Sequence, residues 1–236
     1  MGIVGGVIIM FKRESEMTPS VVRWMKLSGL QTRREFITPW GICDLVGVTL
    51  NSKRVDYRRR LKQTKSISSI TRAALLLSVP EVETTKSVSL DRLKKNFEHA
   101  IPEEVVVIEV ERLITDRFVL KNKNGRLQKL NGWMPLHERL VAVELKLTRV
   151  DEAFRQAISN LGFAQESFVA FPIRTAERIA KDSSKWSRYL HEGIGVIGVG
   201  KRSCHVLVPS TPLHAIPDPA IQLYCVEKFW RSQRRS

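Results

Sequence analysis

The stretch Leu140-Val-Ala-Val-Glu-Leu-Lys-Leu147 constrains the fold more than any other part of this chain. If it forms a strand, its side chains alternate between two faces, and the two charged residues, Glu144 and Lys146, share one of them. Charges in an otherwise apolar strand are costly to bury unless they are paired or hold a metal. Two interpretations follow: a structural ion pair at a strand end, or a metal-binding carboxylate beside a catalytic lysine.

The charge of the chain indicates the kind of partner it binds. Its 236 residues are 43% hydrophobic and 27% charged, with a formal net charge of +15. Such a composition is typical of one large or two small globular domains. So large a positive excess favours a polyanion, and nucleic acid is the usual one. Ribosome binding, membrane-surface binding and a basic protein without such a partner remain open at this point.

Cysteine usage and hydropathy bear on the compartment. Cys43, Cys204 and Cys225 are widely spaced, odd in number and without a Cys-x-x-Cys pair. This pattern favours a reducing compartment and argues against a zinc site or a disulfide scaffold. No apolar run approaches the length needed to cross a bilayer. We therefore expect a cytoplasmic protein without a membrane partner.

The segments before and after residues 51–135 predict an α/β arrangement. We expect a helix over 18–29, strands over 33–38 and 42–50, and a strand over 140–147. After these we expect a helix over about 149–163, strands over 168–171 and 193–199, and helices over 174–181 and 221–230. The strand over 42–50 carries one charge, Asp44, and the helix after the central strand carries Gln156 near its middle.

Residues 51–135 differ in character from the rest of the chain. A basic linker or helix precedes predicted helices over 66–79 and 89–100, then strands over 105–113, 117–120 and 126–130 with a basic turn between the last two. Helix, helix and hairpin resemble a winged helix-turn-helix, whose second helix enters the major groove and whose wing touches the backbone. A structural insertion covering one edge of the sheet is the alternative. The candidate nucleic-acid-binding residues are Arg58, Arg59, Arg60, Lys62, Arg92, Lys94, Lys95, Lys121 and Lys123.

The order of the acidic and basic residues resembles the PD-(D/E)XK nuclease superfamily, whose core runs helix, three strands, helix, strand. Ile42-Cys-Asp-Leu-Val-Gly-Val48 is similar to the family's Asp strand, and Val141-Ala-Val-Glu-Leu-Lys-Leu147 to its Glu-x-Lys strand. Ala153-Phe-Arg-Gln-Ala157 and Phe168-Val-Ala-Phe-Pro172 resemble the helix and strand that follow. The resemblance covers residues 14–50 and about 136–200. It departs from the family at Cys43, which replaces proline, and in an insert of roughly 85 residues, long for a compact-domain connection.

The resemblance implies hydrolysis of phosphodiester bonds with Mg²⁺ or Mn²⁺. Asp44, Glu144 and the backbone carbonyl of Leu145 would hold the metal, which takes oxygen ligands and keeps several waters. Lys146 would orient or help deprotonate the attacking water. Glu16, or else Glu14, resembles the helix glutamate that supports the metal in some members, and Gln156 would contact the substrate near the phosphate. For Glu16 and Gln156, a helix cap and a solvated helix residue are the alternatives.

We therefore expect a restriction-endonuclease-like α/β core over 1–50 and 136–208, with a central mixed sheet flanked by helices. An inserted winged-helix-like α+β subdomain would occupy 51–135, and a C-terminal helix with a basic tail 209–236. The expected function is Mg²⁺-dependent cleavage of DNA. A non-catalytic DNA-binding regulator and an RNA-directed nuclease are the alternatives. A homodimer is compatible with cutting two strands.

Overall fold

The computed structural model describes residues 11–131, 134–211 and 217–232, and the chain forms two compact units. The first unit comprises residues up to Thr49 and from Arg139 to Pro217, and the second Leu50–Glu138 and the chain from Asp218 onward. The sequence placed the limits of the insert at 51 and 135 and set the C-terminal segment apart. In the structure the C-terminal helix is part of the second unit. Side chains beyond Trp230, including the expected basic tail, lie outside the described residues.

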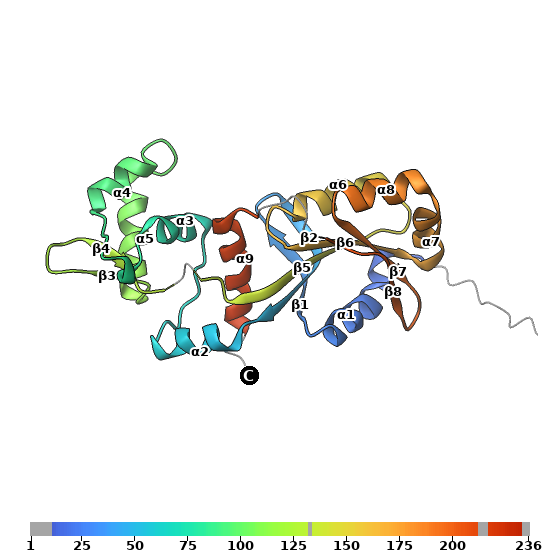
Figure 1. The fold of residues 1–236 in the computed structure, drawn as a ribbon, viewed down its shortest axis with the longest axis horizontal. Coiled ribbons are helices and arrows are strands. Elements are labelled where there is room, and N and C mark those ends of the chain that lie inside the picture. The colour runs from blue at the N-terminus through green and yellow to red at the C-terminus, as the bar shows by residue number, and fades with distance from the viewer. Residues whose placement is uncertain (1–10, 132–133, 212–216, 233–236) are drawn as a thin grey trace, which may run out of the picture. The chain divides into compact units, whose positions relative to one another are not determined.

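A six-stranded mixed sheet forms the centre of the first unit (Figure 1). Its first two strands are antiparallel, its third, fourth and fifth are parallel, and its last runs antiparallel to the fifth. In order across the sheet, the strands are β1 (Gln31–Thr38), β2 (Gly41–Leu50), β5 (His137–Leu145), β6 (Glu166–Pro172), β7 (Ile194–Val199) and β8 (Cys204–Val208). The prediction of an α/β protein with a mixed sheet flanked by helices is confirmed.

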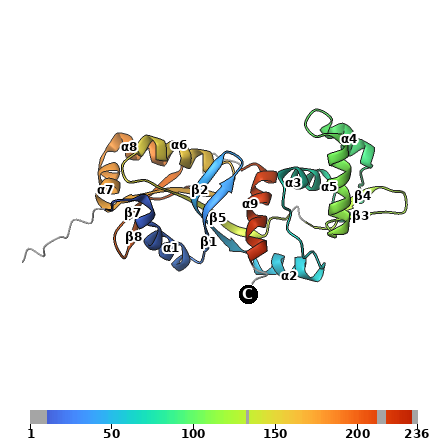
Figure 2. The ribbon, with the colours of Figure 1, turned by 180° about the vertical axis from the view of Figure 1, so that it is seen from behind.

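Helices cover both faces of this sheet (Figures 1 and 2). The single-turn helix η1 (Glu14–Glu16) and α1 (Thr18–Leu27) lie on one face, where Met17, Val21 and Met25 pack on the strands. The other face carries α6 (Val150–Asn160), α7 (Ile173–Lys181) and α8 (Ser183–His191). Because side chains alternate along β5, Val141, Val143 and Leu145 pack in the core on the α1 face. The residues between them, Ala142 and Glu144, therefore face α6.

The second unit combines helices with a small two-stranded hairpin. Its elements are α2 (Ser52–Arg60), α3 (Ile70–Ser78), η2 (Val82–Thr84), α4 (Leu90–Phe97), α5 (Glu103–Thr115), β3 (Val119–Lys121), β4 (Leu127–Lys129) and α9 (Pro219–Ser232). The hairpin turns at Gly125, which has a φ of 74° that suits glycine. Leu223 of α9 packs into the core that α3, α5 and the hairpin share.

The expected strand over 105–113 is wrong, because these residues belong to helix α5. The apolar run Val105-Val-Val-Ile108 favoured a strand on composition. Val106, Val110 and Leu113 are nevertheless buried at a spacing of three and four residues, which is the period of one helix face. Glu103 and Glu104 stabilise the positive end of this helix.

None of the helices that the structure describes is long and apolar enough to cross a membrane. The three cysteines are free thiols.

Candidate active site

Glu144, on strand β5, and Lys146, just after the end of this strand, lie on the face of the sheet that α6 covers. Both are nearly excluded from solvent, with 3% and 6% of their surface exposed. The Asn160 side-chain amide, at the end of α6, donates a hydrogen bond of 2.7 Å to Glu144 Oε1. A carboxylate buried to this degree needs such a donor, a counter-charge or a metal to remain ionised.

Asp44 meets this pair from the neighbouring strand β2. Its Oδ2 accepts a hydrogen bond of 2.7 Å from the backbone N–H of Leu145, the residue after Glu144. Its negative charge is close enough to raise the pKa of Glu144. Two carboxylates that are distant in the sequence therefore share one site because β2 and β5 are adjacent in the sheet.

A distortion of the β1–β2 hairpin helps to bring Asp44 to the site. In a regular strand Cys43 and Leu45 would face the same side, yet the Cys43 thiol contacts Asn160 of α6 and Leu45 packs in the core on the α1 face. Across from Asp44, between the pairs Arg34↔Leu45 and Phe36↔Cys43, Glu35 adopts a φ of 48°. A positive φ at a residue with a Cβ is uncommon, and we infer that it turns this part of the hairpin out of strict alternation.

The pKa of Glu144 is raised above its usual value, chiefly because the carboxyl group is buried. The charge of Asp44 adds to this rise. The Asn160 amide, the Cys43 thiol and the Lys146 ammonium each act in the opposite direction without cancelling it. The pKa of the buried Cys43 thiol is itself raised well above its ordinary value by burial and by Glu144. Burial and the charge of Asp44 therefore both disfavour the ionised form of Glu144, and a cation bound between the two carboxylates would favour it.

Lys146 is linked to the first turn of α6. Its Nζ lies 3.6 Å from Glu152 Oε1, and its backbone N–H donates to Ala170 O of β6 at 3.1 Å. Arg149 joins the same group through Glu152 Oε2 at 2.8 Å. The ammonium group is thus paired with Glu152 rather than extended into solvent. Glu152 was not among the predicted site residues. Its position one helical turn before Gln156 could have indicated it, because residues four apart lie on the same helix face.

The structure places Glu14, rather than Glu16, beside the end of β5. Glu14 Oε1 accepts a hydrogen bond of 3.4 Å from the Leu147 backbone and lies 3.7 Å from Arg149. Glu16 instead accepts from the backbone N–H of Lys12. The preference for Glu16 over Glu14 is therefore not supported by these contacts.

A pocket of about 150 Å³ opens beside Glu144. Gln156 and Asn160 reach it from α6, one helical turn apart, and Trp40 and Ile42 from the β1–β2 hairpin. Thr38, Gly41 and Ser159 complete its lining. The side-chain oxygen of Gln156 is buried and accepts no hydrogen bond from any described residue. Asn160 and Trp40 were not predicted; the four-residue spacing of Gln156 and Asn160 on a helix face that buries alanines could have indicated Asn160.

The donor set fits an oxygen-preferring cation but not a metal cage made of side chains alone. Within the described part of the chain, no group of three or more His, Cys, Asp and Glu side chains could hold a metal ion. Asp44 and Glu144 supply carboxylate oxygens, and the Leu145 backbone runs alongside Asp44. Mg²⁺ commonly binds through one or two carboxylates and completes its shell with water and substrate phosphate.

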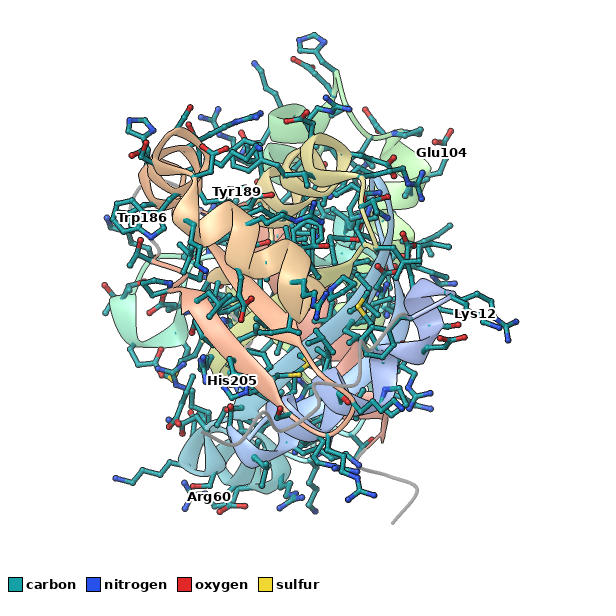
Figure 3. All side chains as sticks on the ribbon, turned by 90° about the vertical axis from the view of Figure 1, so that its right-hand side faces the viewer. Lys12, Arg60, Glu104, Trp186, Tyr189 and His205 are labelled. Carbon is teal, nitrogen blue, oxygen red and sulfur yellow. The ribbon has the colours of Figure 1, made fainter. Side chains whose placement is uncertain are left out.

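Most of the predicted nucleic-acid-binding cations are on the surface of the second unit. Arg59, Arg60 and Lys62 are exposed in and after α2, and Arg60 extends from the ribbon in Figure 3. On α4 and the hairpin, Arg92, Lys95, Lys121 and Lys123 are exposed, whereas Lys94 is half-buried and lies 3.4 Å from Glu103.

The prediction that Arg58 binds nucleic acid is wrong, because its side chain is only 2% exposed. Both carboxylate oxygens of Glu227, on α9, bind its guanidinium. It stabilises the second unit and cannot reach a phosphate. The exposed surface of α5 is mainly acidic and apolar, with Glu104, Glu111 and Ile108 (Glu104 is labelled in Figure 3). Its exposed cation, Arg112, is paired with Glu109 at 2.8 Å, so this helix adds little to the basic surface.

Comparison of the chain with protein-family models, curated proteins and solved structures found no match. Its function must therefore be inferred from the chemistry of the site.

Proposed function

We propose that the chain is a metal-dependent nuclease that hydrolyses phosphodiester bonds in DNA. The observation that carries this proposal is the meeting of Asp44 and Glu144, from adjacent strands, beside the buried ammonium of Lys146. The resemblance to the PD-(D/E)XK superfamily adds support, since α1, β1, β2, β5, α6 and β6 follow that family's order of helix, three strands, helix and strand. The second unit, with its hairpin and exposed cations, would be the winged-helix-like insert.

The residues at the site suit attack of water on a phosphodiester. Asp44 and Glu144 would hold Mg²⁺ or Mn²⁺ through their oxygens, with the Leu145 carbonyl as a third donor. Such an ion offsets the charge that develops on the phosphate and lowers the pKa of a bound water. Lys146 would stabilise the extra negative charge and orient the nucleophilic water. Asn160 positions the Glu144 carboxylate through its hydrogen bond.

The net charge of +15 supports a polyanionic substrate. Exposed cations of the second unit, such as Arg60, Arg92 and Lys123, would bind backbone phosphates without reading sequence. Each phosphate contact makes binding weaker at higher salt, so the slope of affinity against salt would report how many such contacts form.

A plasmid-nicking assay with Mg²⁺ or Mn²⁺ tests the proposal. The wild type should nick supercoiled DNA, and Asp44→Asn and Glu144→Gln should abolish nicking while keeping salt-dependent DNA binding. Glu192→Gln is the matched control, because Glu192 is an exposed carboxylate of the same unit. Wild-type protein that binds DNA but never cuts it with either metal would instead indicate the non-catalytic regulator. Cleavage of structured RNA in preference to DNA would indicate the RNA-directed nuclease.

A further inference from the structure

The pocket beside Glu144 is built for a neutral planar group rather than for a phosphate. Among the described residues that line it, none is lysine or arginine, and Glu144 contributes a negative charge. An anion would be repelled there. Its volume of about 150 Å³ matches a cavity that admits one benzene-sized ring.

Trp40 provides an aromatic surface at this pocket. Its ring lies 6.2 Å from that of Phe163, and a Cβ at Gly162 would come within 2.9 Å of it, so one side of the indole is fixed against the loop after α6. The side chain is nevertheless 44% exposed. A tryptophan that is anchored on one side and open on the other can stack a ligand ring without losing much conformational freedom.

The tip of the hairpin leaves further apolar surface uncovered. Ile37 and Ile42 are paired across β1 and β2 and are 64% and 62% exposed. Ile42 also lines the pocket. Large apolar side chains gathered at the entrance of a polar site are typical of a binding surface rather than of a solvated turn.

Gln156 lines the pocket and carries a hydrogen-bond acceptor that a rotation of its side-chain amide would present there. Its side-chain oxygen is buried and lacks a donor within the described structure. Leaving a buried acceptor without a partner is unfavourable, so the group favours a ligand that brings an N–H. The Asn160 amide nitrogen, one turn further along α6, already donates to Glu144.

We propose that this pocket accepts one unpaired nucleobase of the DNA strand whose phosphate lies at Asp44 and Glu144. The base would stack on Trp40 and donate a hydrogen bond to Gln156. This inference rests on the proposed nuclease function and narrows its substrate to DNA with an unpaired base next to the cut, such as a single strand or a branch. Aromatic stacking and hydrogen bonds to the base edge are the usual means of holding an extruded or single-stranded base.

The binding test uses a labelled single-stranded 12-mer DNA in EDTA, where no cleavage occurs, and the same DNA with one abasic site moved along it. Wild-type protein should lose affinity when the abasic site is at one position, by about five- to a hundredfold, the range for one stacked base. Trp40→Ala should bind the intact strand as weakly as that abasic strand, and the position-specific loss should disappear. Trp186→Ala is the matched control, because Trp186, labelled in Figure 3, is an exposed tryptophan on α8.

A cleavage test in Mg²⁺ separates this inference from the proposed function. Both hold if single strands are cut with a higher kcat/KM than blunt duplex and Trp40→Ala removes that preference. If DNA is cut but no abasic position matters and Trp40→Ala behaves as wild type, the base pocket is refuted and the nuclease stands. If no DNA is cut, yet the abasic scan shows the Trp40-dependent loss of binding, the pocket stands and the nuclease is refuted. The abasic scan on the wild type needs no variant, so misfolding of Trp40→Ala would not leave the question open.

Discussion

The ion pair between Arg58 and Glu227 should dominate the stability of the second unit. Both side chains are almost fully buried, at 2% and 1% exposed. Arg58 also donates to the carbonyl oxygens of Gln63 and Lys65, at 3.2 and 2.6 Å. Its guanidinium lies over the rings of Phe118 and Trp230, 5.0 and 4.3 Å from their centroids.

Replacing Glu227 with glutamine keeps the shape of the side chain but removes its charge and one of its acceptor oxygens. Arg58 would then be a buried cation without a counter-charge, and one of the two oxygens that accept from Arg58 and from the Ile67 backbone N–H would be an NH₂ donor. Breaking one partner of a buried pair typically costs about 3–5 kcal/mol. Replacing both partners with apolar residues of similar volume is often neutral, so Arg58→Met with Glu227→Leu should recover most of the loss.

Hydrogen exchange under native conditions is the suitable assay, because two units need not unfold together. The slowest amides of α3 and α9 should lose protection by about 3–5 kcal/mol in Glu227→Gln. Arg59→Ala is the matched control: Arg59 pairs with Asp56 at 3.2 Å, but both are exposed, so the change should stay below about 1 kcal/mol. An equally small change in Glu227→Gln would refute the burial of a charged pair between α2 and α9.

Three further predictions concern the pH dependence and the chemistry. Asn160→Leu removes the donor that lowers the pKa of Glu144, so the rise of cleavage rate with pH should move to higher pH in a pH–rate profile. Burial, and then the charge of Arg54, lowers the pKa of His137 to about 4, so the folded protein favours the neutral ring. The stability that this neutral ring contributes above pH 6.5 should therefore be lost as the pH falls toward 4, by up to about 3 kcal/mol in the free energy of unfolding. Acid titrations of unfolding should show this loss, and His137→Gln should flatten the profile. Lys146→Met should lower the single-turnover cleavage rate by about 10²–10⁴, the range for a group that assists proton transfer, and equal rates would remove Lys146 from the chemistry.

The chemistry-bearing strands could be predicted because their pattern is local. The alternation of β5 and the single acid in β2 specify which side chains share a face, and adjacency in the sheet brings Asp44 to Glu144. The spacing of Asn160 from Gln156 on α6 was a further local signal, whereas the contacts of Trp40 depend on how the hairpin packs against the loop after α6. These are tertiary facts that a single sequence does not encode in any short spacing.

The second unit shows where local patterns mislead. The run of basic residues in α2 reads as a solvated face, yet Arg58 points inward, because a carboxylate far along the chain in α9 meets it. The apolar run at the start of α5 is typical of a strand, but the segment forms a helix whose residues Val106, Val110 and Leu113 pack in the core of this unit. In both cases a partner that is remote in sequence decides the outcome.

The central claim is that Asp44 and Glu144 together bind one catalytic metal ion. Crystals soaked in Mn²⁺ test it most directly, since the anomalous signal distinguishes a bound manganese ion from a water molecule. We predict a single peak between the two carboxylates in the wild type and none there in Asp44→Asn. A protein that cuts DNA while its metal binds elsewhere, or that shows no peak at these residues, would contradict the claim.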